Sequence, residues 1–265
     1  MNVKRVLSAL LLSCIFCSTY AQSEHFLGFR SGMNFSKFQS PDLNTSMKPG
    51  VLVGFTWRWK FDPAWSLYTD VIYSARGAKH DNPTTTSVGA SPSYTVITHK
   101  NNFNSKFTYI DVPVVFSYRL PIFSKGNIAP YYNTDPVASF NIYGGVNTGY
   151  LFKASQSGSI TQVTDEYNSD TLTSSTSERI IVDNELDSGF SSIDIDAVLG
   201  VGMLFNTGNG RRIFIDVRYN IGVTSINDGH YTKYDSDGDP FMPDIRTKTF
   251  QVTFGMLFST RKRVR

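Results

Sequence analysis

Strict alternation between apolar and polar side chains is the feature that most constrains the fold of this 265-residue chain. In residues 213–223 every odd position is apolar or aromatic, while the even positions include Asp216, Arg218 and Asn220. A period of two places successive side chains on opposite faces of a β-strand. One charged face and one apolar face are typical of a strand in a membrane-spanning β-barrel.

Seven further segments repeat this pattern, which makes eight predicted strands in all. They lie at about 26–35, 48–59, 65–77, 105–119, 138–152, 191–205, 211–224 and 246–259. Short connections at 60–64 and 206–210 alternate with long ones at 36–47, 78–104, 153–190 and 225–245; the connection at 120–137 is too long for a tight turn. We therefore predict an all-β fold, a transmembrane antiparallel up-and-down β-barrel of eight strands with long outer loops and mostly short periplasmic turns.

The two longest connections contain strand-like segments of their own. Residues 94–97 and 179–182 are rich in β-branched and aromatic side chains, which indicates hairpins that protrude beyond the membrane. The Ser/Thr-rich stretch at 171–177 predicts a mobile segment between such strands.

The start of the chain has the features of a secretory leader. Two cations precede an apolar run over 6–17 that is too short to span a bilayer as a helix, and Ala21 ends a cleavage site. Cys14 and Cys17 both lie in this leader, so the mature chain has no thiol and no disulfide. We predict a signal peptide over 1–21 and a single barrel domain over 22–265, with a basic tail at 259–265.

Composition is compatible with a membrane barrel and gives no reason to expect nucleic-acid binding. The hydrophobic fraction is 40% and the mean hydropathy is −0.19, because only every second residue of a barrel strand faces lipid. Without Lys4 and Arg5 of the leader, the net charge of +3 falls to +1. The positive charge of the basic tail alone is larger than this remaining +1. The remaining barrel and loops are thus mildly acidic.

Ten charged residues fall on the strand faces that we assign to the lumen. An eight-stranded barrel is just wide enough to be filled by its own side chains. An unpaired buried charge costs several kcal/mol, and the two signs are nearly balanced here. We predict a polar core of ion pairs that plugs the lumen; the alternative is a narrow path for ions or protons. The ten residues are Arg30, Arg58, Asp70, Arg76, Asp111, Arg119, Asp194, Asp196, Asp216 and Arg218.

One long connection contains a partial calcium motif. Asp235, Asp237 and Asp239 have the spacing with which calcium loops gather oxygen ligands. An EF-hand would have glycine where Pro240 stands and an acid where Arg246 stands, so a solvated acidic turn is the simpler interpretation. No other spacing indicates a metal site, and we predict no cofactor.

The histidines do not form a recognisable catalytic arrangement. Of the four, His80 and His99 lie in a long connection, with Asp81 and Ser87 close to His80 in sequence. Proximity along a loop does not place a nucleophile beside a base. We therefore predict no catalytic residue.

Several segments resemble the PorT-like outer-membrane β-barrel family of Bacteroidetes. Residues 109–115 resemble its Tyr-Leu-Glu-Ile-Pro-Leu-Leu strand, 142–150 resemble its Gly/Tyr-rich strand, and 216–226 resemble its Arg-Tyr-x-x-Gly-Leu-Thr-x-Ile ending. The chain departs from many such barrels because seven residues follow the aromatic Phe258. The resemblance implies the barrel fold and, through the family's namesake, an association with type IX secretion. It implies no shared catalytic residues. Thr171 also matches the short O-glycosylation acceptor of that phylum.

These observations predict a non-enzymatic barrel in the outer membrane of a Gram-negative bacterium, with both termini in the periplasm. Its expected role is structural or accessory, in surface interaction or in an envelope or secretion complex, with membrane lipid around it. One alternative is a small channel for ions or small solutes. A second is a lipid-modifying barrel enzyme, which would need His80 or His99 beside a serine and an acid.

Overall fold

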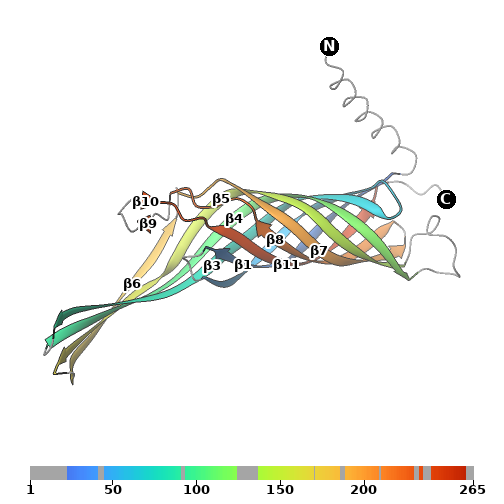
Figure 1. Ribbon diagram of the computed structural model, residues 1–265. Helices are drawn as coiled ribbons and strands as arrows, with labels where there is room; N and C mark the ends of the chain where they lie inside the picture. Colours follow the sequence, from blue (N-terminus) through green and yellow to red (C-terminus); the bar gives the residue numbers. More distant parts are fainter. Residues whose placement is uncertain are drawn as a thin grey trace, which may run out of the picture.

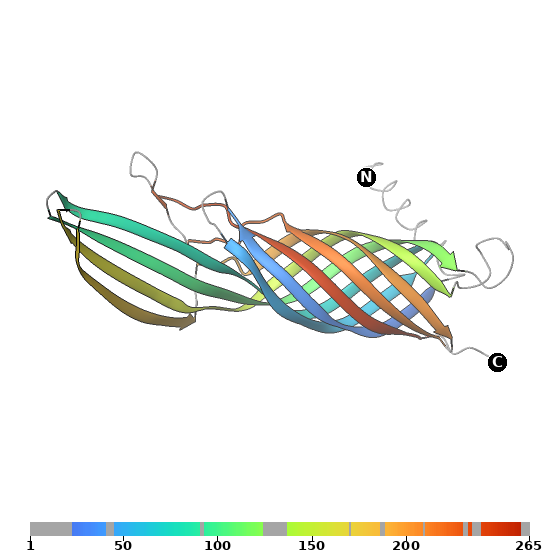
Figure 2. The ribbon, with the colours of Figure 1, turned by 90° about the horizontal axis from the view of Figure 1, so that it is seen from below.

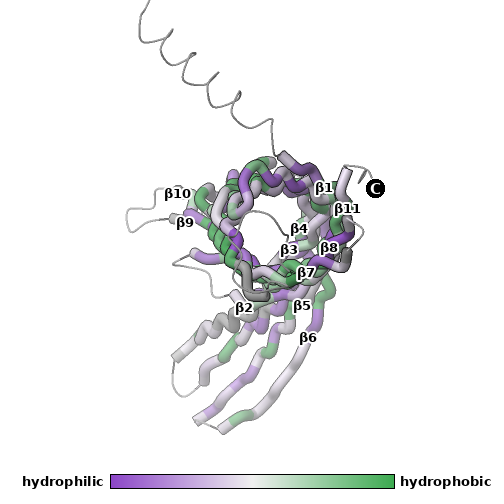
Figure 3. Tube along the Cα trace, turned by 90° about the vertical axis from the view of Figure 1, so that its right-hand side faces the viewer, coloured by the Kyte–Doolittle hydropathy of each residue, from purple (hydrophilic) through white to green (hydrophobic). Residues whose placement is uncertain are grey.

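The computed structural model describes residues 23–40, 45–90, 93–123, 137–169, 171–185, 189–208, 210–229, 233–234 and 240–260. Eight antiparallel strands in it close into a ring (Figures 1 and 3). In ring order they are β1 (Glu24–Gln39), β2 (Thr45–Lys60), β3 (Trp65–Ala90), β4 (Ser93–Phe123), β5 (Ala138–Asn168), β7 (Ile193–Gly208), β8 (Arg211–Gly222) and β11 (Arg246–Ser259). The predicted fold class and strand number are confirmed. No helix among the described residues is long and apolar enough to cross a membrane.

The ring closes because the first and last of its strands pair along their whole length. β1 and β11 are in register from Phe26 opposite Ser259 to Gln39 opposite Arg246. Residues 24 and 259 therefore lie at the same end of the barrel, which we call the terminal rim, and the opposite end is the far rim. The leader predicted over 1–21 lies outside the described residues, so it stays a prediction.

Side chains on the ring strands alternate between the outer surface and the interior. Phe55 is 76% exposed and Phe254 is 60% exposed, whereas their neighbours Thr56 and Thr253 are each 1% exposed. A barrel with apolar side chains outside and polar side chains inside is stable only if lipid surrounds the outer face. The period-two pattern therefore predicted correctly which face of these strands is buried.

Three of the ring strands continue beyond the far rim and form a protruding sheet (Figure 2). The β3–β4 pairing runs to Ala90 opposite Ser93, and β4 pairs with β5 as far as Ser93 opposite Asn168. The additional strand β6 (Thr171–Glu185) pairs with β5 outside the ring, which gives the order β3-β4-β5-β6. The predicted hairpin strands at 94–97 and 179–182 are confirmed as parts of β4 and β6.

The prediction of a mobile segment at 171–177 is wrong, because these residues belong to β6 and pair with β5. Much of the two longest connections is likewise strand. The Ser/Thr-rich composition hides this, since both faces of the protruding sheet are largely polar and show no apolar alternation. Backbone hydrogen bonds to the neighbouring strand hold the segment instead.

Apolar clusters close the interior toward both rims. Toward the terminal rim, Phe26, Tyr68, Val115, Tyr143, Val198, Leu204, Phe214 and Leu257 pack together. At the far rim, the cluster contains Phe38, Ala78, Phe107, Tyr109, Ala154, Ile226 and Ile245. Beside the far rim lies a small ribbon of β9 (Lys233–Tyr234) and β10 (Pro240–Phe241). The charged side chains of the lumen therefore lie between the far-rim cluster and the terminal rim, partly among the aromatic rings of the other cluster.

Candidate functional site

All ten lumen charges named above are buried, none more than 6% exposed. Eight of them form two separate clusters of ion pairs in the interior. Arg58 and Arg119 belong to neither cluster.

The central cluster is electrically balanced. Arg30 lies 3.3 Å from Asp70 and 3.5 Å from Asp216, and Arg218 lies 3.1 Å and 3.4 Å from the same two carboxylates. The hydroxyl of Tyr143 donates a hydrogen bond of 2.7 Å to Asp216 Oδ1. Two cations and two anions thus cross-link β1, β3 and β8 through the middle of the barrel.

The far cluster, nearer the far rim, has one cation for three anions. Arg76 contacts Asp111 at 2.7 Å, Asp196 at 3.0 Å and Asp194 at 3.3 Å. Thr247 Oγ1 lies 2.9 Å from Asp194 Oδ2 and 3.0 Å from Asp196 Oδ1, but a hydroxyl can donate only one proton. This cluster therefore depends on Arg76 for nearly all of its charge compensation.

Arginines dominate the interior near the terminal rim. Arg58 donates to Ser66 Oγ at 2.9 Å and lies 5.1 Å from the ring centroid of Tyr68. Arg119 donates to the carbonyl of Pro63 at 2.5 Å. Arg212, which the sequence analysis did not select, lies 3.4 Å from Glu24. The lumen is thus segregated, with excess negative charge toward the far rim and excess positive charge toward the terminal rim.

Two inward-facing glycines make room for the buried carboxylates. A Cβ atom added to Gly149 would lie 2.7 Å from Asp111 Oδ1, and one added to Gly202 would collide with Asp216 Oδ1. Glycine is required at both positions because the carboxylate occupies the space of a side chain.

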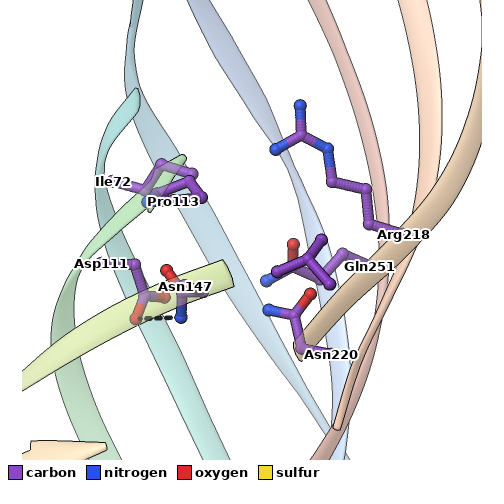
Figure 4. Close-up of a pocket in the computed structure, with 8 residues that line it drawn as sticks. Ile72, Asp111, Pro113, Asn147, Arg218, Asn220 and Gln251 are labelled. Carbon is purple, nitrogen blue, oxygen red and sulfur yellow. Dashed lines mark hydrogen bonds between the residues drawn. The ribbon is translucent and has the colours of Figure 1, made fainter. Parts of the chain in front are cut away.

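A small cavity of about 10 Å³, space for about one water molecule, lies between the two clusters. Asp111 and Asn147 face Arg218, Asn220 and Gln251 across it (Figure 4). Asp111 Oδ2, Asn147 Oδ1 and Asn220 Oδ1 make no hydrogen bond with the protein. Unpaired oxygen atoms beside a cavity suit ordered water. Its lining residues are Ile72, Asp111, Pro113, Asn147, Val198, Arg218, Asn220 and Gln251.

The sequence analysis missed uncharged members of the lumen network. Tyr143, Asn147 and Thr247 all contribute hydrogen bonds to the buried carboxylates. The period-two alternation places Tyr143 and Asn147 on the same strand face as Asn141, so their inward direction could have been found. The ring of Tyr143 was not recognised as inward-facing because most aromatic side chains of the strands face the lipid.

Replacement of Tyr143 by phenylalanine is expected to lower the free energy of unfolding by about 1–3 kcal/mol. The change removes the donor to Asp216 Oδ1 while it leaves the ring in its apolar cluster. Equilibrium unfolding of the protein in lipid vesicles measures the effect. Tyr150→Phe, at an exposed position of β5, is the matched control. Equal effects of the two variants would contradict a structural role for the Asp216 hydrogen bond.

The structure does not assemble the candidate catalytic residues. His80 is 7% exposed and packs against Phe38, whereas Ser87 is seven positions further along β3 and points to the opposite face of the sheet. His99 pairs across the strands with Gln162. No group of three or more His, Asp or Glu side chains in the described ranges is arranged to bind a metal ion.

Two other predicted sites stay predictions. Asp235, Asp237 and Asp239 lie outside the described residues, so the calcium hypothesis stays a prediction. Thr171 is exposed at the start of β6, opposite Asn168. Its side chain is accessible there, and its O-glycosylation stays a prediction.

Several solved structures of outer membrane proteins are similar to this chain at low sequence identity. Ail from Yersinia pestis is 13% identical, with 89% of this chain and 99% of that chain covered and a TM-score of 0.35. OprG from Pseudomonas aeruginosa is 11% identical, with 89% of this chain and 96% of that chain covered and a TM-score of 0.39. Surface protein A from Neisseria is 10% identical, with 89% of this chain and 98% of that chain covered and a TM-score of 0.37. The outer membrane protease OmpT from Escherichia coli is also similar, at 10% identity and a TM-score of 0.28, so the likeness assigns no activity.

Family membership rests on a different comparison. No curated protein matches the chain. The model of the family described as "Outer membrane protein beta-barrel domain" matches residues 20–228, which include seven of the eight ring strands. The chain therefore belongs to the outer membrane protein β-barrel domain family and is a protein of the outer membrane of Gram-negative bacteria.

Proposed function

We propose that this barrel is a non-conducting membrane anchor that presents the protruding sheet as an interaction surface outside the cell. The observation that supports this function is the sheet itself, whose two outer edges are unpaired. In the described part of the chain, β6 pairs only with β5, and β3 has no second partner beyond His80. Open edges are the surfaces on which another chain can add a strand.

The proposal places both termini in the periplasm and the protruding sheet outside the cell. Two features favour this orientation. The leader expected at the start of the chain delivers a barrel from the periplasmic side, and bacterial barrels have their long segments outside. Trp57, Trp59 and Trp65 lie near the terminal rim, where an interfacial aromatic belt would then face the periplasm.

The proposal of a plugged lumen predicts an electrically silent protein. Two ion-pair clusters and an apolar layer at the far rim lie across the interior of the described strands. We expect no stepwise conductance in planar bilayers. Conductance steps that change when Arg58 or Asp216 is neutralised would favour the channel alternative instead.

Photo-crosslinking in intact cells tests the interaction surface. A photoreactive residue at Ile181, which is 76% exposed on β6, is expected to give an adduct with an external macromolecule. The same residue at Thr207 near the terminal rim is the control, and it is not expected to give that adduct. Identical adducts from both positions, or none from Ile181, would contradict the proposed surface.

Support of a type IX secretion complex is the second candidate function. Its basis is the resemblance of residues 109–115, 142–150 and 216–226 to the PorT-like family. Those residues lie in the barrel wall, except for 223–226, which follow β8. This function requires partners at the periplasmic end. Affinity purification from crosslinked outer membranes is expected to recover envelope proteins from the wild type, and also from a variant without the protruding sheet, if this candidate is correct.

A further inference from the structure

Three lysines from neighbouring strands gather where the protruding sheet leaves the barrel wall. They are Lys48 of β2, Lys79 of β3 and Lys106 of β4, and we call them the lysine triad. The Lys48 ammonium reaches across β3 and donates to the carbonyl of Ser105 at 3.1 Å. The Lys48 side chain passes over Gly77 of β3, where an added Cβ would lie 3.1 Å from Lys48 Cδ. Gly77 is in turn the cross-strand neighbour of Lys106. Glycine at this point therefore lets Lys48 approach the lysine of β4.

The triad concentrates positive charge that no carboxylate among the described side chains neutralises. The Lys48 ammonium donates to the carbonyl of Ser105, next to Lys106. Burial, followed by the positive charges of Lys106 and Lys79, lowers the pKa of Lys48, so its ammonium lies near both of these lysines. None of the three forms an ion pair within the described residues. On the same sheet face, Glu185 of β6 is two strands from Lys106, and its carboxylate is bound by Lys153. An external anion can supply the compensation that the described side chains do not.

The triad lies just beyond the apolar belt of the barrel. Phe152 of β5 is 72% exposed and Val51 of β2 is 60% exposed. These two residues mark the edge of the apolar outer surface that is nearer the far rim. Lys106 pairs with Ser155, three residues beyond Phe152. At about 3.3 Å per residue this is about 10 Å along the strand, and less along the membrane normal because barrel strands are tilted. That height corresponds to the headgroup region, not to the hydrocarbon core.

We propose that Lys48, Lys79 and Lys106 bind a phosphate group on the headgroup of an outer-leaflet lipid. The inference rests on the proposed orientation, in which the far rim faces the outside. Ammonium groups bind phosphate as point charges. A phosphate monoester, with its high charge density, matches three ammonium groups better than a single carboxylate does. The exposed Val51 and Phe152 below the triad offer an apolar wall to the acyl chains of the same lipid, which free phosphate does not use.

Binding of defined lipids to the purified full-length protein in detergent tests the proposal. The probes are the phosphorylated glycolipid of the outer leaflet, its dephosphorylated form and inorganic phosphate, each followed by native mass spectrometry and by titration. Wild-type protein is expected to bind the phosphorylated lipid at least about tenfold more tightly than the dephosphorylated lipid. The triple variant Lys48→Gln, Lys79→Gln, Lys106→Gln is expected to lose that difference.

A second triple variant controls for net charge. It removes two charges near the terminal rim, with Lys60→Gln and Arg211→Gln, and one on the protruding sheet, with Lys100→Gln. This variant is expected to bind like the wild type. Equal binding by the two triple variants would overturn the proposal. Inorganic phosphate that binds as tightly as the lipid would overturn the assignment to a lipid. Heat-modifiable gel migration confirms that each variant is folded.

The outcome is separable from the test of the interaction surface. Lipid binding in detergent does not depend on a protein partner, and the triad lies at the base of the sheet, away from Ile181. Failure of the lipid assay with a positive crosslink from Ile181 would reject the lysine site alone.

Discussion

Replacement of Arg76 by methionine is expected to lower the free energy of unfolding by about 3–5 kcal/mol. The guanidinium contacts Asp111, Asp194 and Asp196, and no other cation contacts these three carboxylates in the described part of the chain. Its loss leaves buried anions that repel one another. Urea unfolding in lipid vesicles, followed by tryptophan fluorescence, measures the effect.

A surface ion pair supplies the matched control for this prediction. Arg246 lies 2.7 Å from Asp244, and both side chains are 51% exposed, so Arg246→Met is expected to change stability by less than about 1 kcal/mol. Asparagine at Asp111 and Asp196 is expected to restore part of the stability of Arg76→Met, because it removes two of the uncompensated charges. An Arg76 effect as small as the Arg246 effect would show that the far cluster is not held together by this guanidinium.

Replacement of Phe254 by arginine is expected to cost about 2–4 kcal/mol. Phe254 is 60% exposed in the middle of β11, between Ser31 of β1 and Ile215 of β8, so its side chain faces the hydrocarbon core of the membrane. A charge at this depth has no partner and little access to water. Unfolding in vesicles of defined acyl-chain length measures the loss.

The control for this prediction is an exposed apolar side chain that contacts water and not lipid. Ile181 on the protruding sheet is 76% exposed, yet Ile181→Arg is expected to change stability by less than about 0.5 kcal/mol, because water already surrounds this position. If both substitutions cost the same, the apolar belt does not mark the membrane. A harmless Phe254→Arg would lead to the same conclusion.

Period-two alternation predicted the ring strands well and the protruding sheet poorly. In the ring, one face of each strand meets lipid and the other meets the lumen, so the pattern in residues 213–223 is unambiguous. The strand β6 has water on nearly all of its side chains, including those of 171–177. Without a buried face there is no selection for alternation, and only pairing with β5 reveals the strand.

Alternation also predicted which charged residues point inward, but not which of them meet. Arg76 and Asp194 are 118 residues apart in the chain, and their contact depends on the relative stagger of β3 and β7, two strands that are not neighbours in the ring. Arg58 shows the same limit, since it points inward as predicted but packs on Tyr68 and Ser66 and has no carboxylate partner among the described residues.

The sequence by itself determined the number of ring strands, the direction of their side chains and the membrane as their surroundings, because each depends on local period and on connection length. Tertiary structure decided the segregation of charge along the lumen, the four-stranded sheet beyond the far rim and the meeting of Lys48, Lys79 and Lys106. These features require the register between separate strands, and register is a property of the closed ring.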